Sequence, residues 1–303
     1  MSTPGNTATA APDEAGGNRL VRQLKYSAYL IRKNTLTTIG FSIVGVLIVL
    51  ALLAPVIAPY PDQALGATDM SQALESPSLK HLFGTDEMGR DLFSRVLYGT
   101  RISLQIGILV VGLALAIGVP LGLIAGFVGG FIDEAIMRVT DIFLSFPPLL
   151  LAIAVAALLG RSLTNAMIAI AIAWWPWYTR LIRGTVVSMR EKPFIEAARV
   201  IGTSPLYIMV KHLLPNSMSP VIVQASLDFG SVILTSAALS FLGLGAQPPE
   251  PEWGLILSTA RNYFLVAPWY SFFPGMAMVV TVLAFNLVGD GLREITDPKT
   301  RRL

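Results

Sequence analysis

Residues 103–129 read SLQIGILVVGLALAIGVPLGLIAGFVG, a run of 27 residues without one charged side chain. A helix needs about 20 consecutive apolar residues to cross the roughly 30 Å hydrocarbon core of a bilayer. The run therefore predicts a membrane-spanning helix. Its glycines Gly118, Gly122 and Gly126 recur every four residues and predict a face that admits close contact with a neighbouring helix.

Five other apolar runs reach, or nearly reach, the same length. Because lipid offers the backbone no hydrogen-bond partners, spans of this kind are helical. The expected fold class is all-α: a polytopic membrane protein with six transmembrane helices. We place them at residues 36–58, 103–129, 143–160, 164–182, 219–244 and 270–290. Only Gly160–Leu163 separates the third run from the fourth, which predicts a tight hairpin.

The composition agrees with a membrane location. The chain has 303 residues, 53% of them hydrophobic and 14% charged, and a mean hydropathy of +0.64. Soluble domains carry about a quarter charged residues. The absence of cysteine excludes disulfides, thiolate metal sites and cysteine nucleophiles. Two histidines, His81 and His212, are too few for a histidine-rich metal site, so we expect none.

The distribution of lysine and arginine predicts the orientation. Five of these residues precede residue 34, one is Arg138, six lie within 180–218 and four follow residue 291, together 16 of the 22. Cytoplasmic segments carry such an excess, so we expect both termini in the cytoplasm and a multi-pass protein of the plasma (inner) membrane. The basic pI near 9.2 fits this orientation better than nucleic-acid binding.

Residues 196–216, on the cytoplasmic side of this topology, read EAARVIGTSPLYIMVKHLLPN. Glu196, Ala197 and Ala198 are helix formers, and Gly202 accepts the positive φ of a turn. Pro215 is expected to end the segment that follows. The alternative is an ordinary basic loop with a helix in it.

The triplet Glu196-Ala197-Ala198, with Gly202 and the pair Leu214-Pro215, resembles the cytoplasmic EAA signature of ATP-binding cassette (ABC) importer permeases. The resemblance implies two short helices with a turn at Gly202. It also implies that the turn docks into a groove on a separate ATPase, so these six residues form an ATPase-coupling loop. ATP and Mg would be bound by the partner ATPases, and this chain would hold no cofactor.

Three other segments resemble one branch of that family, the dipeptide, oligopeptide and nickel importers, and within it the C-type subunit. They are HLFGTDEMGRDLFSRVLYGTRISL (81–104), LSFLGLGAQPPEPEWG (239–254) and FNLVGDGLREITDPK (285–299). With the coupling loop, the resemblance covers about residues 25–300. It implies that the chain forms half of a pore, with a second, homologous permease chain forming the other half. It also implies two cytoplasmic ATPases and an external binding protein as partners. The implied substrate is a short peptide, foremost a dipeptide; nickel, glutathione and oligopeptides are alternatives within the family.

The segment 81–104 also has a local interpretation, an interfacial helix that anchors the chain. Thr85 or Asp86 is expected to cap its start. Arg90, Arg95 and Arg101 are expected to reach lipid phosphates, and we assign no chemistry to the acids of the segment.

Two further segments have mainly structural interpretations. Residues 247–253, QPPEPEW, cannot continue a helix and predict an external loop that turns back toward the pore. Residues 174–178, WWPWY, precede Arg180 and Arg183 and predict an aromatic belt at the membrane interface. A tryptophan site for an aromatic or cationic ligand is the less favoured interpretation of this cluster.

Candidate pore-lining residues lie in the fifth run: Gln224, Asp228 and Ser236. Asp228 is the only acid deep inside it, and a carboxylate that faced lipid would cost roughly 2.5–3.5 kcal/mol. Two hypotheses stay open. Asp228 pairs with a polar group across the permease interface, or it contacts the cationic amino terminus of a passing peptide.

The domain prediction is a disordered tail at 1–18, a segment at 19–98 with the first span, a permease domain at 99–293 and a cytoplasmic tail at 294–303. The chain has no G-x-x-x-x-G-K-[ST] phosphate loop and no hydrolase motif, so we predict no enzyme and no catalytic residues. A secondary transporter or channel would need ionisable residues along its path, and the spans hold few. A purely structural membrane subunit is the third alternative.

Overall fold

The chain folds as a bundle of helices, which confirms the predicted all-α class. The computed structural model describes residues 34–296, and within them the only β-type pairing is an isolated bridge between Thr85 and Asp91. The predicted tail at 1–18, the segment 19–33 and the chain beyond residue 296 lie outside the described residues. The helices are α2 (Thr35–Ile57), α3 (Pro61–Ala64), α4 (Leu92–Val128), α5 (Gly130–Leu144), α6 (Pro148–Leu159), α7 (Leu163–Met189), α8 (Pro193–Val200), α9 (Pro205–Tyr207), a π-helical turn (Ile208–Leu213), α10 (Leu214–Phe241), α11 (Trp253–Ala260) and α12 (Pro268–Thr296), with 3-10 turns at Met70–Gln72 and Arg261–Tyr263.

Four helical stretches in residues 34–296 are long and apolar enough to cross a membrane: α2, α4, Pro205–Phe241 and Pro268–Ile295. A fifth candidate is the bent pair α5 and α6. Six spans were expected, and these candidates make five. The predicted span that does not qualify is α7. It has 27 residues, but WWPWY and two arginines lower its mean hydropathy.

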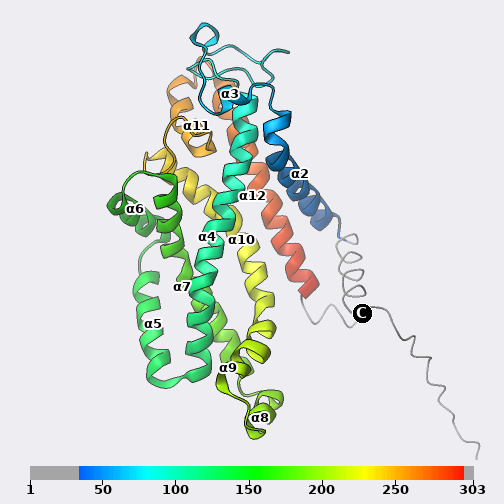
Figure 1. Cartoon of the computed structure of the whole chain (residues 1–303), viewed down its shortest axis with the longest axis vertical. Coiled ribbons are helices and arrows are strands. Elements are labelled where there is room, and N and C mark those ends of the chain that lie inside the picture. Colours follow the sequence, from blue (N-terminus) through cyan, green and yellow to red (C-terminus); the bar gives the residue numbers. More distant parts are fainter. Residues whose placement is uncertain (1–33, 297–303) are drawn as a thin grey trace, which may run out of the picture.

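The span predicted at 143–160 is not one continuous helix. Helix α5 ends at Leu144, α6 begins at Pro148, and their axes differ by 88°. Pro147 and Pro148 lack backbone donors and clash with the preceding turn, so one helix cannot run through them. In consequence α6 projects sideways at the edge of the bundle (Figure 1), with Leu158 87% exposed near its end.

Helix α4 begins at Leu92, well before the predicted start of the second span. Its N-cap is Asp91, whose carboxylate accepts a hydrogen bond from the backbone N–H of Ser94 at 2.8 Å. The predicted caps Thr85 and Asp86 are wrong, because both lie in the turns that precede α4. The segment 81–104 was expected to form a separate interfacial helix. Its residues from Leu92 onward form the first part of α4.

Glycines set the contact between α4 and α7. A Cβ on Gly118 would meet the carbonyl oxygen of Trp175 at 2.6 Å, and one on Gly122 would meet that of Thr179 at 2.4 Å. Gly126 approaches α7 in the same way one turn later. The predicted close-contact face is confirmed: the two backbones touch over successive turns, as small residues allow in membrane bundles.

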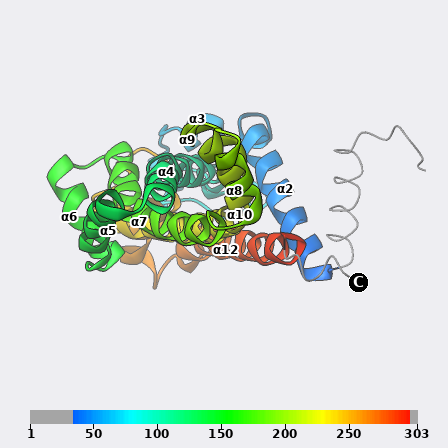
Figure 2. The same ribbon diagram turned by 90° about the horizontal axis from the view of Figure 1, so that it is seen from below.

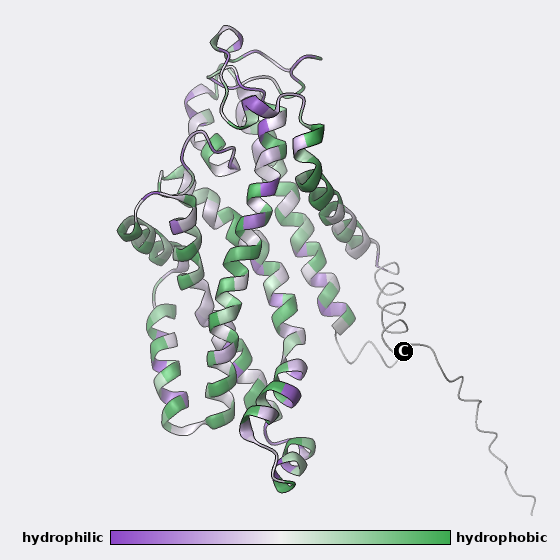
Figure 3. Cartoon of the chain, in the orientation of Figure 1, coloured by the Kyte–Doolittle hydropathy of each residue, from purple (hydrophilic) through white to green (hydrophobic). Residues whose placement is uncertain are grey.

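The arrangement separates two polar ends from an apolar middle. Helices α8 and α9 lie at one end, and α3, α11 and the loops around them lie at the other (Figure 1). Seen from below, α2 and α6 lie at opposite edges of the bundle (Figure 2). Hydrophobic residues dominate the helices between the ends (Figure 3), and side chains such as Leu52 and Val56 of α2 are 72% and 82% exposed. Lipid is the solvent that suits such a surface.

Candidate functional site

The segment predicted as a coupling loop forms a sharp helical turn at one end of the bundle. Helix α8 ends in a C-terminal motif in which the N–H of Gly202 donates to Arg199 O at 3.0 Å and that of Thr203 donates to Ala198 O at 3.1 Å. Gly202 has φ +77°, the left-handed conformation that this motif requires. Ser204 then caps α9 by accepting from the N–H of Tyr207. The expected short helix followed by a turn at Gly202 is present, but the second helix is not a separate short one, since the helical path from Pro205 continues to Phe241.

One face of this turn is anchored and the other is bare. Ile195 is fully buried and Ala198 is 6% exposed, and both belong to the main hydrophobic core. Val200 and Ile201 are each 80% exposed, and Leu206 is 67% exposed. We call Val200, Ile201 and Leu206 the apolar knob.

A groove of about 600 Å³ lies beside the knob. It is lined by Ala197, Ala198, Tyr207 and His212, among others. Glu196 is exposed in the first turn of α8, where the helix dipole favours an acid. No hydrogen bond or ion pair holds its side chain within residues 34–296.

Pro215 does not end the helix, contrary to the sequence-based expectation. The helical path continues from Pro205 to Phe241, and Pro215 lies in the first turn of α10. The turn before it is π-helical, with the N–H of Leu214 donating to Met209 O, five residues back. The wider π turn accommodates the ring of Pro215 at the start of a new α-helical register. Leu214 packs against the core, whereas Pro215 is exposed.

The predicted pore residues lie on α10 but do not share one environment. The Nε2 of Gln224 donates to Asp228 Oδ1 at 3.0 Å, and both side chains are partly exposed. Ser236 is fully buried inside this chain, so its side chain has no surface to offer a pore.

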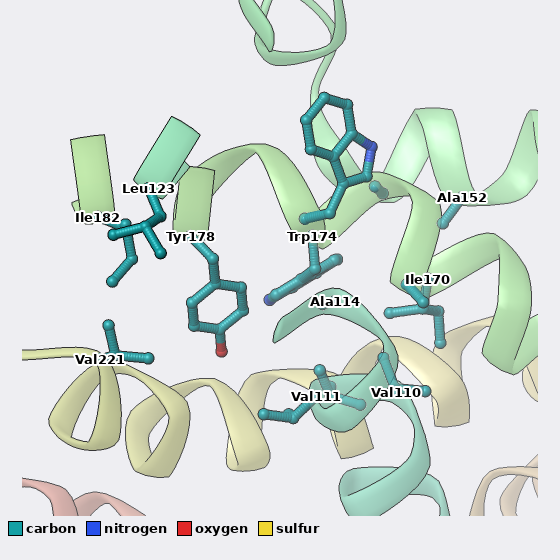
Figure 4. Close-up of a cluster of buried hydrophobic side chains, with 14 of the residues drawn as sticks. Val110, Val111, Ala114, Leu123, Ala152, Ile170, Trp174, Tyr178, Ile182 and Val221 are labelled. Atoms are coloured by element: carbon teal, nitrogen blue, oxygen red, sulfur yellow. The ribbon is translucent and has the colours of Figure 1, made fainter. Parts of the chain in front are cut away.

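Asp228 faces two aromatic residues of α7 that sequence reasoning assigned elsewhere. Trp174 and Tyr178 lie next to its carboxylate, and the Tyr178 hydroxyl points toward α10, the helix that carries Val221 (Figure 4). Asp228 Oδ2 and Tyr178 Oη are both buried, and neither has a hydrogen-bond partner in the described part of the chain. The predicted aromatic belt is wrong for most of its members: Trp174, Trp175 and Tyr178 are at most 9% exposed, and Trp177 alone reaches 49%. The four-residue spacing of Trp174 and Tyr178 was the signal for a shared helix face.

The sequence matches the family described as binding-protein-dependent transport system inner membrane component over residues 118–302. Residues 24–77 match the N-terminal transmembrane domain of oligopeptide transport permease C. The chain belongs to this permease family.

Curated relatives place the permease among ABC importers of the dipeptide and oligopeptide type. It is 49% identical to the dipeptide transport system permease protein DppC of Alkalihalophilus pseudofirmus, over 89% of this chain and 88% of that one. It is 43% identical to the probable D,D-dipeptide transport system permease protein DdpC of Escherichia coli K12, over 95% and 97%. It is 48% identical to the glutathione transport system permease protein GsiD of Escherichia coli, over 84% of each chain.

The fold of the permease is also found in a solved structure. The inward-facing MetNI methionine ABC transporter aligns with a TM-score of 0.53 at 20% identity, covering 67% of this chain and 97% of that one. At this identity the likeness shows a shared fold. Expected sequence motifs and observed helices thus agree on an ABC permease embedded in a membrane.

At the end opposite α8 and α9, the permease holds a buried ionic cluster. Asp86 is fully buried and accepts from Arg90 Nε at 2.7 Å, and Arg95 Nε lies 3.4 Å from the same carboxylate. Arg95 also faces the carbonyl oxygens of Pro249 and Glu250 at 3.4 Å. The prediction that Arg90 and Arg95 reach lipid is therefore wrong, since they are 8% and 3% exposed; only Arg101 is exposed.

Residues 247–253 do not continue α10, as predicted, and their loop closes onto this ionic cluster. The indole N–H of Trp253 donates to Val96 O at 3.1 Å, which fastens the loop to α4. Glu252 caps α11 by accepting from the N–H of Leu255 at 2.8 Å. Burial raises the pKa of the Glu252 carboxyl. Sequence reasoning missed this cap and the ionic cluster, because their partners lie far apart in the chain.

Proposed function

We propose that the permease forms half of a translocation pore for short peptides in an ABC importer. Dipeptides are the foremost substrate, because two of the relatives above are named for dipeptide transport and the sequence segments 81–104 and 239–254 resemble the same branch. Glutathione, whose transport names a third relative, nickel and oligopeptides are the competing substrates.

The proposed complex contains a second, homologous permease chain, two cytoplasmic ATPases and an external binding protein. The ATPases bind ATP and Mg, and this chain is not catalytic. Both termini lie in the cytoplasm, and the coupling loop does too. In this topology α7 and the bent pair α5 and α6 each count as a span, which gives six with the four longer candidates.

The apolar knob is the observation that carries the coupling assignment. Val200 and Ile201 project from a turn whose other face is locked into the core by Ile195. Exposed apolar side chains on a rigid base favour a protein partner over water. ATP-driven closure of the ATPases would move α8 and, through the core that it shares with α7, rock the helices about the pore.

Uptake by the purified complex tests the function. The permease, its partner chain, the ATPases and the binding protein are reconstituted in liposomes and offered labelled dialanine, glutathione or Ni²⁺. We expect ATP-dependent uptake of dialanine. Uptake of Ni²⁺ or glutathione alone would reassign the substrate, and uptake that ignores ATP would remove the permease from ABC transport.

A matched pair of variants tests the knob. Val200→Asp with Ile201→Asp is expected to release the ATPases during purification while the permease stays in the membrane. Leu79→Asp is the control, because Leu79 is 99% exposed at the other end of the molecule. Retention of the ATPases by the double variant would refute the assignment.

A further inference from the structure

Asp228 is a carboxylate that lacks a cation. It sits in the middle of α10, and within residues 34–296 no lysine, arginine or histidine forms an ion pair with it. Gln224 satisfies Oδ1, but Oδ2 is buried without a partner. An ionised, unpaired carboxylate in a low-dielectric interior is costly, and a cation would offset this cost.

The groups around Oδ2 suit one kind of cation. The hydroxyl of Tyr178 is a second unpartnered atom beside it, and its oxygen can accept a hydrogen bond. Trp174 lies next to the carboxylate. A primary ammonium has three donors on one centre, so it can donate to Asp228 Oδ2 and to the Tyr178 oxygen at the same time.

An adjoining groove provides room for the rest of a small ligand. It has a volume of about 580 Å³ and is lined by polar and apolar side chains of α7 and α10, among them Thr185, Asn216 and Gln224, and by Arg293 of α12. This volume falls within the roughly 300–1,000 Å³ of small-molecule sites. Gln224 belongs to the groove and also holds Asp228, so it joins the groove to the carboxylate.

We propose that Asp228, Tyr178 and Trp174 form a binding site for the α-ammonium group of a peptide in the translocation path. This inference rests on the proposed function and deepens it: the permease itself selects substrates with a free amino terminus. Dipeptides and glutathione share that group, whereas a peptide with an acetylated amino terminus lacks the charge.

The absence of cysteine from the chain permits a direct test. Thr185→Cys introduces a single thiol into the groove of the permease. The permease–ATPase complex is treated with a maleimide without the binding protein, and alkylation of this chain is followed by mass spectrometry. Dialanine is expected to slow alkylation, and N-acetyl-dialanine is not.

Substitutions in the Thr185→Cys background separate recognition from structure. Asp228→Asn keeps the shape and is expected to raise the half-protecting dialanine concentration roughly tenfold or more, as for a lost charge-assisted hydrogen bond. Tyr178→Phe removes only the hydroxyl and is expected to raise it about threefold to tenfold. Asp290→Asn, which removes an exposed charge from α12, is the control and is expected to leave protection unchanged.

Three outcomes would overturn the site. They are equal protection by both peptides, unchanged protection in Asp228→Asn, and no protection in a complex that still transports dialanine with its binding protein. The last outcome would leave the proposed permease function intact. A complex that transports no peptide under any condition, yet shows selective protection, would overturn the proposed function and keep the site.

Discussion

The guanidinium carbon of Arg199 lies 5.5 Å from the centre of the Phe127 ring, which joins α8 to the last turn of α4. Arg190, the C-terminal cap of α7, makes a second link to the same turn of α4, donating to Gly126 O at 3.4 Å. Helix α8 is therefore connected to α4 both through the buried core and through the side chain of Arg199. Displacement of α8 has two routes into the bundle.

Loss of the Arg199–Phe127 contact should weaken coupling without preventing assembly. A cation–π contact at a partly exposed site contributes about 0.5–1 kcal/mol, so Arg199→Ala is expected to lower peptide transported per ATP roughly twofold to fivefold. Reconstituted vesicles supply both rates. Arg138→Ala, which removes a 76% exposed cation elsewhere, is the control. An unchanged ratio in Arg199→Ala would show that the core route suffices.

Gly202 should not tolerate substitution, because of its backbone conformation and not because of crowding by neighbouring atoms. No atom lies within 4 Å of a Cβ built there, but φ is +77°. Gly202→Ala is expected to cost about 1 kcal/mol and Gly202→Pro more, with loss of transport. Gly184→Ala is the matched control, since that position is equally open but helical. Co-purified ATPase and uptake are the readouts, and wild-type uptake by Gly202→Pro would remove the turn from coupling.

Glu196→Lys is expected to reduce ATPase binding at normal membrane levels of the permease. The acid is exposed in the first turn of α8, where a cation opposes the helix dipole at a cost of roughly 0.3–1 kcal/mol. Co-purification measures the effect, and Glu191→Lys, just before the helix, is the control. Equal ATPase binding by both variants would leave Glu196 without a role.

Asp86 should matter more to stability than any exposed acid. Asp86→Asn leaves Arg90 and Arg95 buried without their carboxylate, and breaking such a cluster costs about 3–5 kcal/mol. Glu134→Gln breaks an exposed pair of the same i,i+4 spacing and is expected to cost under about 1 kcal/mol. Thermal unfolding in detergent compares them, and equal Tm values would contradict the buried cluster.

Glu252 should make stability depend on pH. Because its pKa is raised by burial, the folded state holds the proton more tightly than the unfolded state. Its contribution is present at low pH and is lost as the pH rises through the folded pKa. Glu252→Gln keeps the cap acceptor and is expected to flatten this dependence. Glu75→Gln, which changes an exposed acid outside this cap, is the control, and parallel pH profiles of Tm for the two variants would refute the assignment.

The parts of the fold that sequence predicted are those set by local chemistry. Gly202 predicted a turn because glycine favours the left-handed conformation that ends a short helix. Gly118, Gly122 and Gly126 predicted a close contact with a neighbouring helix. The errors have local causes too: Pro147 and Pro148 split one expected span, and a π turn lets Pro215 start a helix where it was expected to end one.

Sequence did not predict contacts between distant segments. Arg95 meets the carbonyl of Pro249, 154 positions away, and nothing in either neighbourhood marks the other. Trp174 and Tyr178 were assigned to the membrane interface because aromatic residues beside arginines usually lie there. Their burial against α10 depends on the tertiary packing of α7. Of the residues around this site, the sequence therefore indicated Asp228, whereas only the fold shows that Trp174 and Tyr178 lie beside it.

Helix α4 spans about 55 Å from its 37 residues. It is clasped at one end by the ionic cluster and at the other by Arg190 and Arg199, and its glycines press it against α7 between them. Pro120, inside the helix, is the position at which it can kink. Elsewhere these contacts hold α4 as one body, so a tilt imposed at the end near Arg190 and Arg199 is expected to displace the ionic cluster at the far end in the opposite direction. The two ends of the permease are then linked mechanically through a single helix.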